Sequence, residues 1–103
     1  MTDGIQSGNS AFEAIDPKLT MFALANGVDL SKSDEHRRLE WYSDGFERGI
    51  VIELTDDGTF DIGVFKWTSG GADSATPVAL HVGVATDDVM HHLDPAVEAA
   101  NGL

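Results

Sequence analysis

The sequence predicts a small α+β domain: a four-stranded, mainly antiparallel sheet with the N- and C-terminal helices packed on one of its faces. Two β-patterned runs flank an Asp-Asp-Gly turn, and helix-start signals of the Asp-Pro type occur near both ends of the chain. At 103 residues and 42% hydrophobic content, the chain is long and apolar enough for one core. We therefore expect a flexible N-terminal arm over 1–10 and a single domain over 11–103.

The strongest local signal is a hairpin between strands predicted at about 48–55 and 59–67. A three-residue loop over 56–58 makes one face of this hairpin wholly apolar, whereas a two-residue loop would mix apolar and polar side chains on both faces. Glycine at position 58 suits the left-handed conformation that such a loop needs. The predicted cross-strand pairs are Leu54–Phe60, Ile52–Ile62 and Ile50–Val64.

The other elements follow from capping signals and side-chain periodicity. Helices are predicted at about 17–26 and 87–101, with a kink or restart of the second helix at Asp94-Pro95. A strand is predicted at about 77–85 from alternating apolar residues. The predicted core contains Ile50, Ile52, Leu54, Phe60, Ile62, Val64, Leu80 and Val82 from the sheet, and Leu19, Phe22, Leu93 and Val97 from the helices.

The run over 36–42 fits two patterns, because a helix-start signal precedes it while its apolar residues alternate as in a strand. The turn that follows favours a strand at about 37–43. With a four-residue loop over 44–47, Leu39 would lie opposite Ile52 and Trp41 opposite Ile50. Arg38 would then face Glu53 on the other side of the sheet. We expect residues 28–34 to form a connection.

Charge is the most unusual bulk property of the chain. Eighteen acidic residues against six basic ones give a net charge of −12. A field of this sign repels nucleic-acid phosphates and anionic lipid and favours basic protein surfaces, although acidity also serves solubility or adaptation to salt. No apolar run reaches the ~20 residues that span a bilayer. We expect a cytoplasmic protein without a cofactor, bound to neither nucleic acid nor membrane.

The predicted hairpin register assigns a second face to the sheet, pointing away from the core. This face carries Val51, Glu53, Asp61, Phe65 and Trp67. Exposed aromatic rings beside charged residues are typical of a surface for a protein partner or a homodimer. Alternatively, the N-terminal arm or the loop over 68–75 covers the rings. Glu53 and Asp61 face each other on an open surface, which is a poor setting for acid–base catalysis.

Histidines and acidic residues near the C-terminus form a second candidate site. On an α-helix, Asp87 and His91 share a face, as do Asp88 and His92. Together with His81 on the preceding strand, Asp88 and His92 would offer a divalent metal three ligands. The same residues could instead compensate the helix dipole and one another, and adjacent histidines point about 100° apart on a helix.

We therefore expect a small, acidic, non-catalytic interaction module, such as an adaptor, inhibitor or immunity-type protein. It would bind a basic protein or a second copy of itself through the outer sheet residues. The alternative is a small metal- or ligand-binding protein, or a metal-dependent enzyme, that uses His81, His91, His92 and Asp88. No sequence motif of a hydrolase elbow or a nucleotide-binding loop is present.

Overall fold

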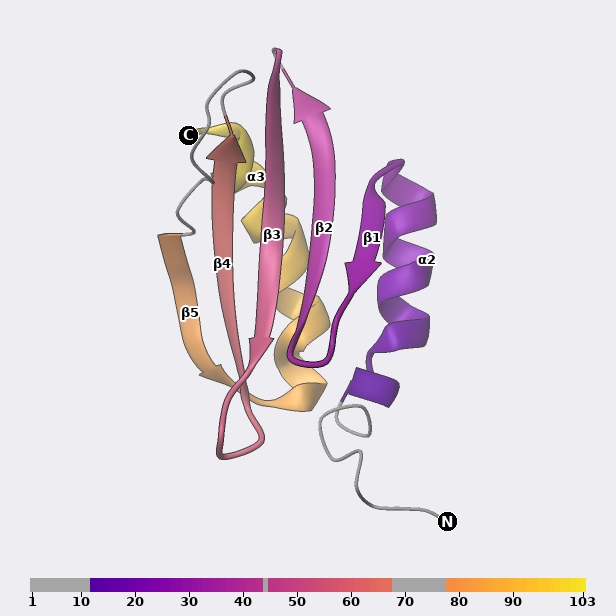
Figure 1. Ribbon diagram of the computed structural model, residues 1–103, viewed down its shortest axis with the longest axis vertical. Helices are drawn as coiled ribbons and strands as arrows, with labels where there is room; N and C mark the ends of the chain where they lie inside the picture. The colour runs from indigo at the N-terminus through magenta and orange to yellow at the C-terminus, as the bar shows by residue number, and fades with distance from the viewer. Residues whose placement is uncertain (1–11, 44, 68–77) are drawn as a thin grey trace.

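The computed structural model describes residues 12–43, 45–67 and 78–103, so the predicted arm over 1–10 lies outside it. The described chain has an α+β fold with a five-stranded antiparallel sheet and two α-helices. The strands are neighbours in chain order, from β1 to β5 (Figure 1). The elements are α2 (Asp16–Asn26), β1 (Asp29–Lys32), β2 (His36–Ser43), β3 (Phe46–Leu54), β4 (Phe60–Trp67), β5 (Val78–Val84), the 3-10 helix η2 (Thr86–His92) and α3 (Leu93–Asn101).

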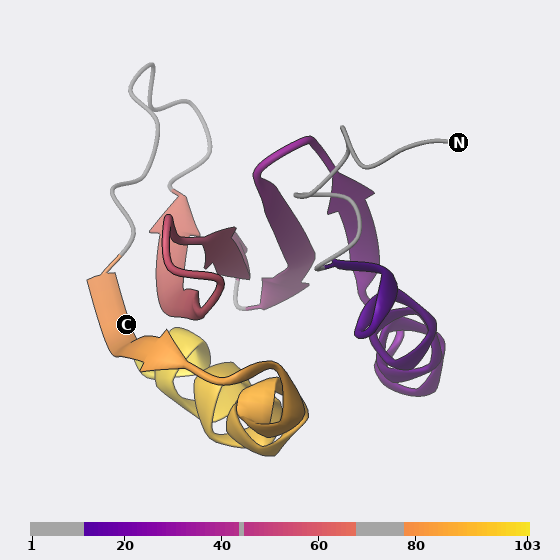
Figure 2. The same ribbon diagram turned by 90° about the horizontal axis from the view of Figure 1, so that it is seen from below.

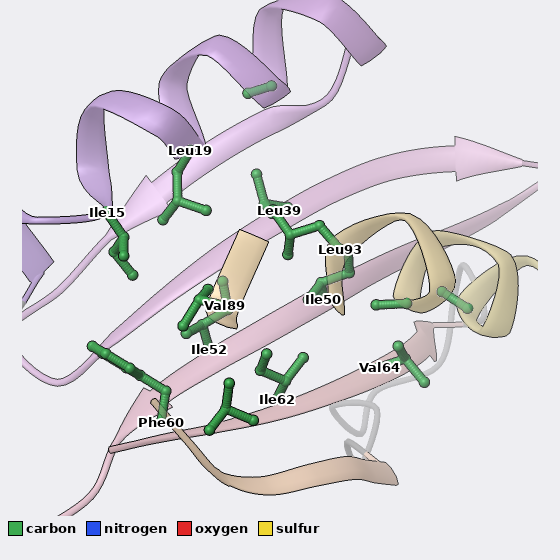
Figure 3. Close-up of a cluster of buried hydrophobic side chains, with 14 of the residues drawn as sticks. Ile15, Leu19, Leu39, Ile50, Ile52, Phe60, Ile62, Val64, Val89 and Leu93 are labelled. Atoms are coloured by element: carbon green, nitrogen blue, oxygen red, sulfur yellow. The ribbon is translucent and has the colours of Figure 1, made fainter. Parts of the chain in front are cut away.

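Both helices lie on the same side of the sheet, as the sequence predicts. Helix α3 packs across β3 and β4, and α2 packs beside β1 at the other end of the sheet (Figure 2). The apolar side chains between them form one cluster (Figure 3). The opposite face of the sheet is left without a helix in the described part of the chain.

The β3–β4 hairpin has the predicted register. Leu54 pairs with Phe60, Ile52 with Ile62 and Ile50 with Val64. The loop closes where the Thr55 amide donates to the Thr59 carbonyl oxygen at 2.9 Å, and Gly58 has a φ of 83°. Two threonine hydroxyls, from Thr55 and Thr59, donate to Oδ1 of Asp57. These bonds hold the pKa of Asp57 below its usual range.

Strand β2 pairs with β3 two residues away from the predicted register. Ser43 lies opposite Phe46, so only two residues separate the strands, and Gly45 has a φ of 83°. The four-residue loop was wrong because a two-residue turn with glycine at positive φ matches the twist of the strands better. Leu39 consequently pairs with Ile50 rather than Ile52, and Arg38 lies opposite Val51 rather than Glu53. A shift of two residues keeps every side chain on its predicted face.

Strand β1 is a fifth strand where we expected a connection. It pairs antiparallel with β2, with Leu30 opposite Leu39 and Asp29 opposite Glu40. Only one residue of this four-residue strand is apolar, so its sequence carries no alternating pattern. Its backbone forms a strand because the β2 edge is free to pair with it.

Strand β5 spans nearly the predicted range but does not alternate as predicted. Its register against β4 shifts twice, between the pairs Gly63–Ala79, Ile62–His81 and Phe60–Val84. Gly83 has a φ of 66°, and its amide donates to Asp61 Oδ1 at 3.0 Å. These bulges turn Val82 out of the core, where it is 72% exposed, while Val84 is buried. The prediction of Val82 as a core residue was therefore wrong.

Helix α2 begins and ends where the Asp16-Pro17 and Asn26-Gly27 signals predicted, with Gly27 in the left-handed region. Asp16 does not cap it. Its carboxylate instead accepts hydrogen bonds from Nε and Nη2 of Arg37, at 2.8 and 3.0 Å. The buried Arg37 guanidinium also stacks 3.9 Å from the ring of Phe12. A buried ion pair thus ties the start of α2 to β2.

The C-terminal helical segment changes type before the predicted Asp94-Pro95 restart. Residues 86–92 form the 3-10 helix η2, and α3 begins at Leu93. The end of α3 is held by β3, because Nη1 of Arg48 donates to the carbonyl oxygens of Ala100 and Asn101 at 2.8 and 2.7 Å. Trp41 Nε1 donates to the side chain of Asn101 at 2.9 Å. Cationic donors at a helix C-terminus satisfy carbonyls that lack helical partners.

The core contains most of the predicted residues and several others. Ile50, Ile52, Phe60, Ile62, Val64, Leu19 and Leu93 are buried as predicted. Leu54, Leu80, Phe22 and Val97 are partly buried against them. Phe12 and Ile15, which precede α2, are also buried, and the Phe12 ring packs 5.3 Å from that of Phe60.

Candidate functional site

The face of the sheet that points away from the helices holds the predicted partner-binding residues. We call it the outer face. Cross-strand pairing assigns to it the described residues Asp29, Ser31, His36, Arg38, Glu40, Tyr42, Glu47, Gly49, Val51, Glu53, Asp61, Gly63 and Phe65. Val51, Glu53 and Asp61 thus lie on the predicted face. Trp67 pairs with Glu47 and takes an outer-face position, but its side chain lies outside the described part of the structure.

Phe65 is on the outer face but is not exposed. It is 1% exposed, and its ring lies directly over Gly49, its cross-strand partner. The guanidinium of Arg38 lies 4.9 Å from the ring centroid. The prediction of an exposed Phe65 was therefore wrong. The ring fills the space that a side chain at position 49 would occupy, which compensates for the glycine in the strand.

Arg38 belongs to a group of interacting charged side chains on the outer face. Arg38 Nη2 lies 3.1 Å from Glu40 Oε2, and Glu47 is hydrogen-bonded to Glu40. Burial raises the pKa of the Glu47 carboxyl, and the hydrogen bond and negative charge of Glu40 raise it further, while Arg38 opposes them. The Glu47 carboxyl is therefore harder to ionise than an ordinary glutamate.

Glu40 and Glu47 were not among the predicted site residues. Their proximity follows from the two-residue turn between β2 and β3, which places Tyr42 opposite Glu47 and Glu40 two pairs further along, opposite Gly49. The four-residue loop expected from sequence would have included Glu47 in the loop. The Asp-Gly dipeptide at 44–45 was the signal that could have found this pair.

The other end of the outer face carries a second acidic pair. Glu53 and Asp61 lie directly opposite each other, as predicted. Glu53 is exposed, and Asp61 is half-buried and accepts the Gly83 amide. Asp61 therefore holds the β5 bulge in place.

The predicted metal ligands come together only in part. The rings of His81 and His92 pack with centroids 4.1 Å apart, which joins β5 to η2. Asp88 and His91 are exposed. In a 3-10 helix, residues four apart point about 120° away from each other, so Asp88 does not share a face with His92 as it would on an α-helix.

Nowhere in the described parts of the chain do three histidine or acidic side chains converge on a position that could hold a metal ion. His81 and His92 alone would supply two of the four ligands of a typical zinc site. Their ring contact is instead a packing interaction between strand and helix.

Comparison with known proteins finds no matching family model, no matching curated protein and no matching solved structure. None of the described helices has the length and apolar character needed to cross a membrane. The function must therefore be argued from the surfaces of this chain.

Proposed function

We propose that this chain is a small non-catalytic interaction module that binds a basic surface of a protein partner with its outer face. The observation that supports it is the charge of that face. Among its described residues are five carboxylates against one arginine, and Arg38 is already paired with one of them. The carboxylates are Asp29, Glu40, Glu47, Glu53 and Asp61.

The arrangement of these charges favours a protein surface over a single small cation. The two acidic pairs lie at opposite ends of the face, Glu40 with Glu47 and Glu53 with Asp61, and Val51 lies between them. Tyr42, which is 74% exposed, adds an aromatic contact at one end. Separated charges around a partly apolar centre match an extended partner surface with lysine or arginine at its rim.

Glu47 adds a link between binding and pH. Its raised pKa means that this carboxyl is harder to ionise in the free protein than an ordinary glutamate. A lysine or arginine placed next to it would favour ionisation, so binding would release a proton. Affinity should therefore increase as the pH rises through the pKa of Glu47.

The test measures binding of a fluorescent peptide rich in lysine and arginine, used as a stand-in for a basic partner surface. The outer-face variant Glu47→Gln/Glu53→Gln is compared with Asp94→Asn/Glu98→Gln, which removes the same charge from exposed positions on α3, across the sheet. At low salt, charge contacts are only weakly screened. Losing the contacts of Glu47 and Glu53 should therefore reduce the affinity of the outer-face variant for the peptide by roughly 2- to 30-fold.

The α3 variant should bind as the parent does within about twofold. Equal weakening by both double variants would mean that binding depends on net charge alone, and it would contradict a site on the outer face. Unchanged affinity in the outer-face variant would contradict it as well. The pH dependence gives an independent readout, since it should flatten in the variant that lacks Glu47.

A further inference from the structure

A histidine lies on the outer face at the end that carries the second acidic pair. His36 on β2 lies opposite Glu53 on β3, and Glu53 lies opposite Asp61 on β4. The three side chains therefore form a row across three strands, with the imidazole next to the two carboxylates. Residues directly opposite each other on antiparallel strands have Cβ atoms about 4.5–5.5 Å apart, so a charge on the ring acts directly on Glu53.

The turn before β2 holds this ring in place. Ser33 Oγ and His36 Nδ1 are hydrogen-bonded at 3.0 Å, and the Ser33 amide donates to the His36 carbonyl oxygen, also at 3.0 Å. The side chain is half-buried. Within the described part of the chain, the ring makes no hydrogen bond through Nε2 and no ion pair. The ring is thus positioned beside the Glu53–Asp61 pair without being bonded to either carboxylate.

The ionisable groups that neighbour His36 on each adjacent element are mostly acidic. Strands β3 and β4 contribute one carboxylate each, the turn before β2 contributes two, β1 ends in a lysine, and β2 carries one arginine on the same face. They are Glu53, Asp61, Asp34, Glu35, Lys32 and Arg38. Arg38 is paired with Glu40, and both helices lie on the opposite side of the sheet (Figure 2). The charge at this end of the outer face therefore depends mainly on the carboxylates and on whether His36 carries a proton.

We propose that His36 regulates the outer face through its protonation state. This inference rests on the proposed function, because it requires a basic partner at the Glu53–Asp61 pair. With a neutral imidazole, both carboxylates are available to a lysine or arginine of the partner. A protonated imidazole places a positive charge beside Glu53, where it competes with the partner's cation. Histidine side chains ordinarily change charge between about pH 5 and 8, so the partner would bind at neutral pH and be released in mild acid.

This effect adds to that of Glu47 at the other end of the face. As the pH falls, the Glu47 carboxylate loses a negative charge and His36 gains a positive one, so both changes weaken the attraction for a basic partner. One opposite-charge pair between neighbouring strands changes affinity by about 1.5- to 5-fold, which sets the size of the effect expected from His36 alone.

The test uses the fluorescent basic peptide described above, at about pH 8 and about pH 5.5 in low salt. All samples carry Glu47→Gln, so that the other pH-dependent carboxyl is absent. The protein with His36 should bind the peptide about 1.5- to 5-fold more weakly at the lower pH. His36→Gln should lose most of this difference. His36→Lys carries a permanent charge, so it should bind at the higher pH as weakly as the protein with His36 does at the lower pH.

Three controls separate the charge of His36 from other effects. His91→Gln removes an exposed histidine on η2 and should keep the pH difference. Leu24→Lys adds a permanent charge on α2, at a residue that is 76% exposed, and should weaken binding less than His36→Lys does. Ser33→Ala removes the hydrogen bond to Nδ1 but keeps the imidazole, so the pH difference should remain. Circular dichroism at both pH values checks that each variant keeps the fold.

The outcomes distinguish this regulation from the proposed function. A full pH difference in His36→Gln, its loss in Ser33→Ala, or equal affinities of His36→Lys and Leu24→Lys would overturn the role of His36 but leave the outer face as the binding site. Equal weakening by the outer-face and α3 double variants would contradict the proposed function, and the role of His36 with it.

Nuclear magnetic resonance gives a readout that does not depend on affinity. At about pH 6.5, added peptide should move the ring signals of His36 toward those of neutral imidazole, because the bound cation disfavours a second positive charge beside Glu53. The ring signals of His91 should stay where they are. Signals of His36 that do not move at saturating peptide would contradict the proposed competition.

Discussion

The ion pair between Asp16 and Arg37 allows a prediction about how α2 is attached to the sheet. Replacing Asp16 with alanine removes both acceptors of a guanidinium whose side chain is 5% exposed. Arg37 Nη1 would keep its bonds to the carbonyl oxygens of Ser33 and His36. Nε and Nη2 would lose their partners, 2.8 and 3.0 Å away. The variant therefore leaves a buried charge only partly satisfied.

Breaking one side of a buried ion pair costs about 3–5 kcal/mol. The Asp16 side chain is 19% exposed, so water can reach part of the vacated position, and we expect the lower end of that range. About 3 kcal/mol corresponds to a fall of roughly 12–24 °C in the unfolding temperature of a domain this size. The Arg37 guanidinium also stacks on Phe12, 3.9 Å from the ring centroid. Without the carboxylate, this stacking should offset little of the lost stability.

The assay is urea and thermal unfolding at neutral pH, followed by circular dichroism. Asp94→Ala is the control, because Asp94 also precedes a proline at the start of a helix but is exposed. Asp94→Ala should lower the free energy of unfolding by less than about 1 kcal/mol. Adding Arg37→Met to Asp16→Ala should recover part of the loss, since the unpaired charge is then gone. If Asp16→Ala costs no more than Asp94→Ala, the ion pair does not anchor α2.

Two further predictions concern the hairpin. Gly49→Ala would place a Cβ 2.4 Å from Cζ of Phe65 and 2.6 Å from the Leu39 carbonyl oxygen, so it should destabilise the fold by about 1–3 kcal/mol in urea unfolding. Gly102→Ala meets nothing closer than 3.5 Å and should stay within about 0.5 kcal/mol; equal costs would contradict the packing of Phe65 on Gly49. Asp57→Asn tests the loop. The folded-state pKa of Asp57 lies below its ordinary value of 3.8, so its contribution to stability is present above that pH and disappears as the pH falls through the folded-state pKa. The variant should therefore be less stable than the parent at neutral pH and approach it in acid, and a difference that does not change with pH would refute this role.

Much of the fold could be predicted because side-chain alternation in a strand has a period of two. The β3–β4 register followed from the requirement that one face be apolar, and the structure confirms it. The predicted β2–β3 register was off by two residues. A period of two cannot detect this shift, because it leaves every side chain on the same face. Strand β1 escaped prediction because one apolar residue in four carries no pattern. In β5, the bulges broke an alternation that looked regular in the sequence.

The candidate site was predictable in part for the same reason. Alternation placed Glu53, Asp61 and Phe65 on the outer face, since that depends only on parity. It could not show that Phe65 is buried, because the space for its ring exists only where β4 places it over Gly49. The Glu40–Glu47 pair depends on the length of the β2–β3 turn, and the separation of Asp88 from His92 depends on the helix type of η2.

By itself, the sequence determined which side chains of β2, β3 and β4 share a face, where α2 begins and ends, and the net charge of −12. These are local properties, set by backbone geometry and by capping residues next to one another in the chain. The tertiary structure decided which faces are open. It covered Phe65, paired Asp16 with Arg37 across 21 positions, and left β5 as an uncharged edge. Those outcomes depend on contacts between strands and helices distant in sequence, which no local pattern encodes.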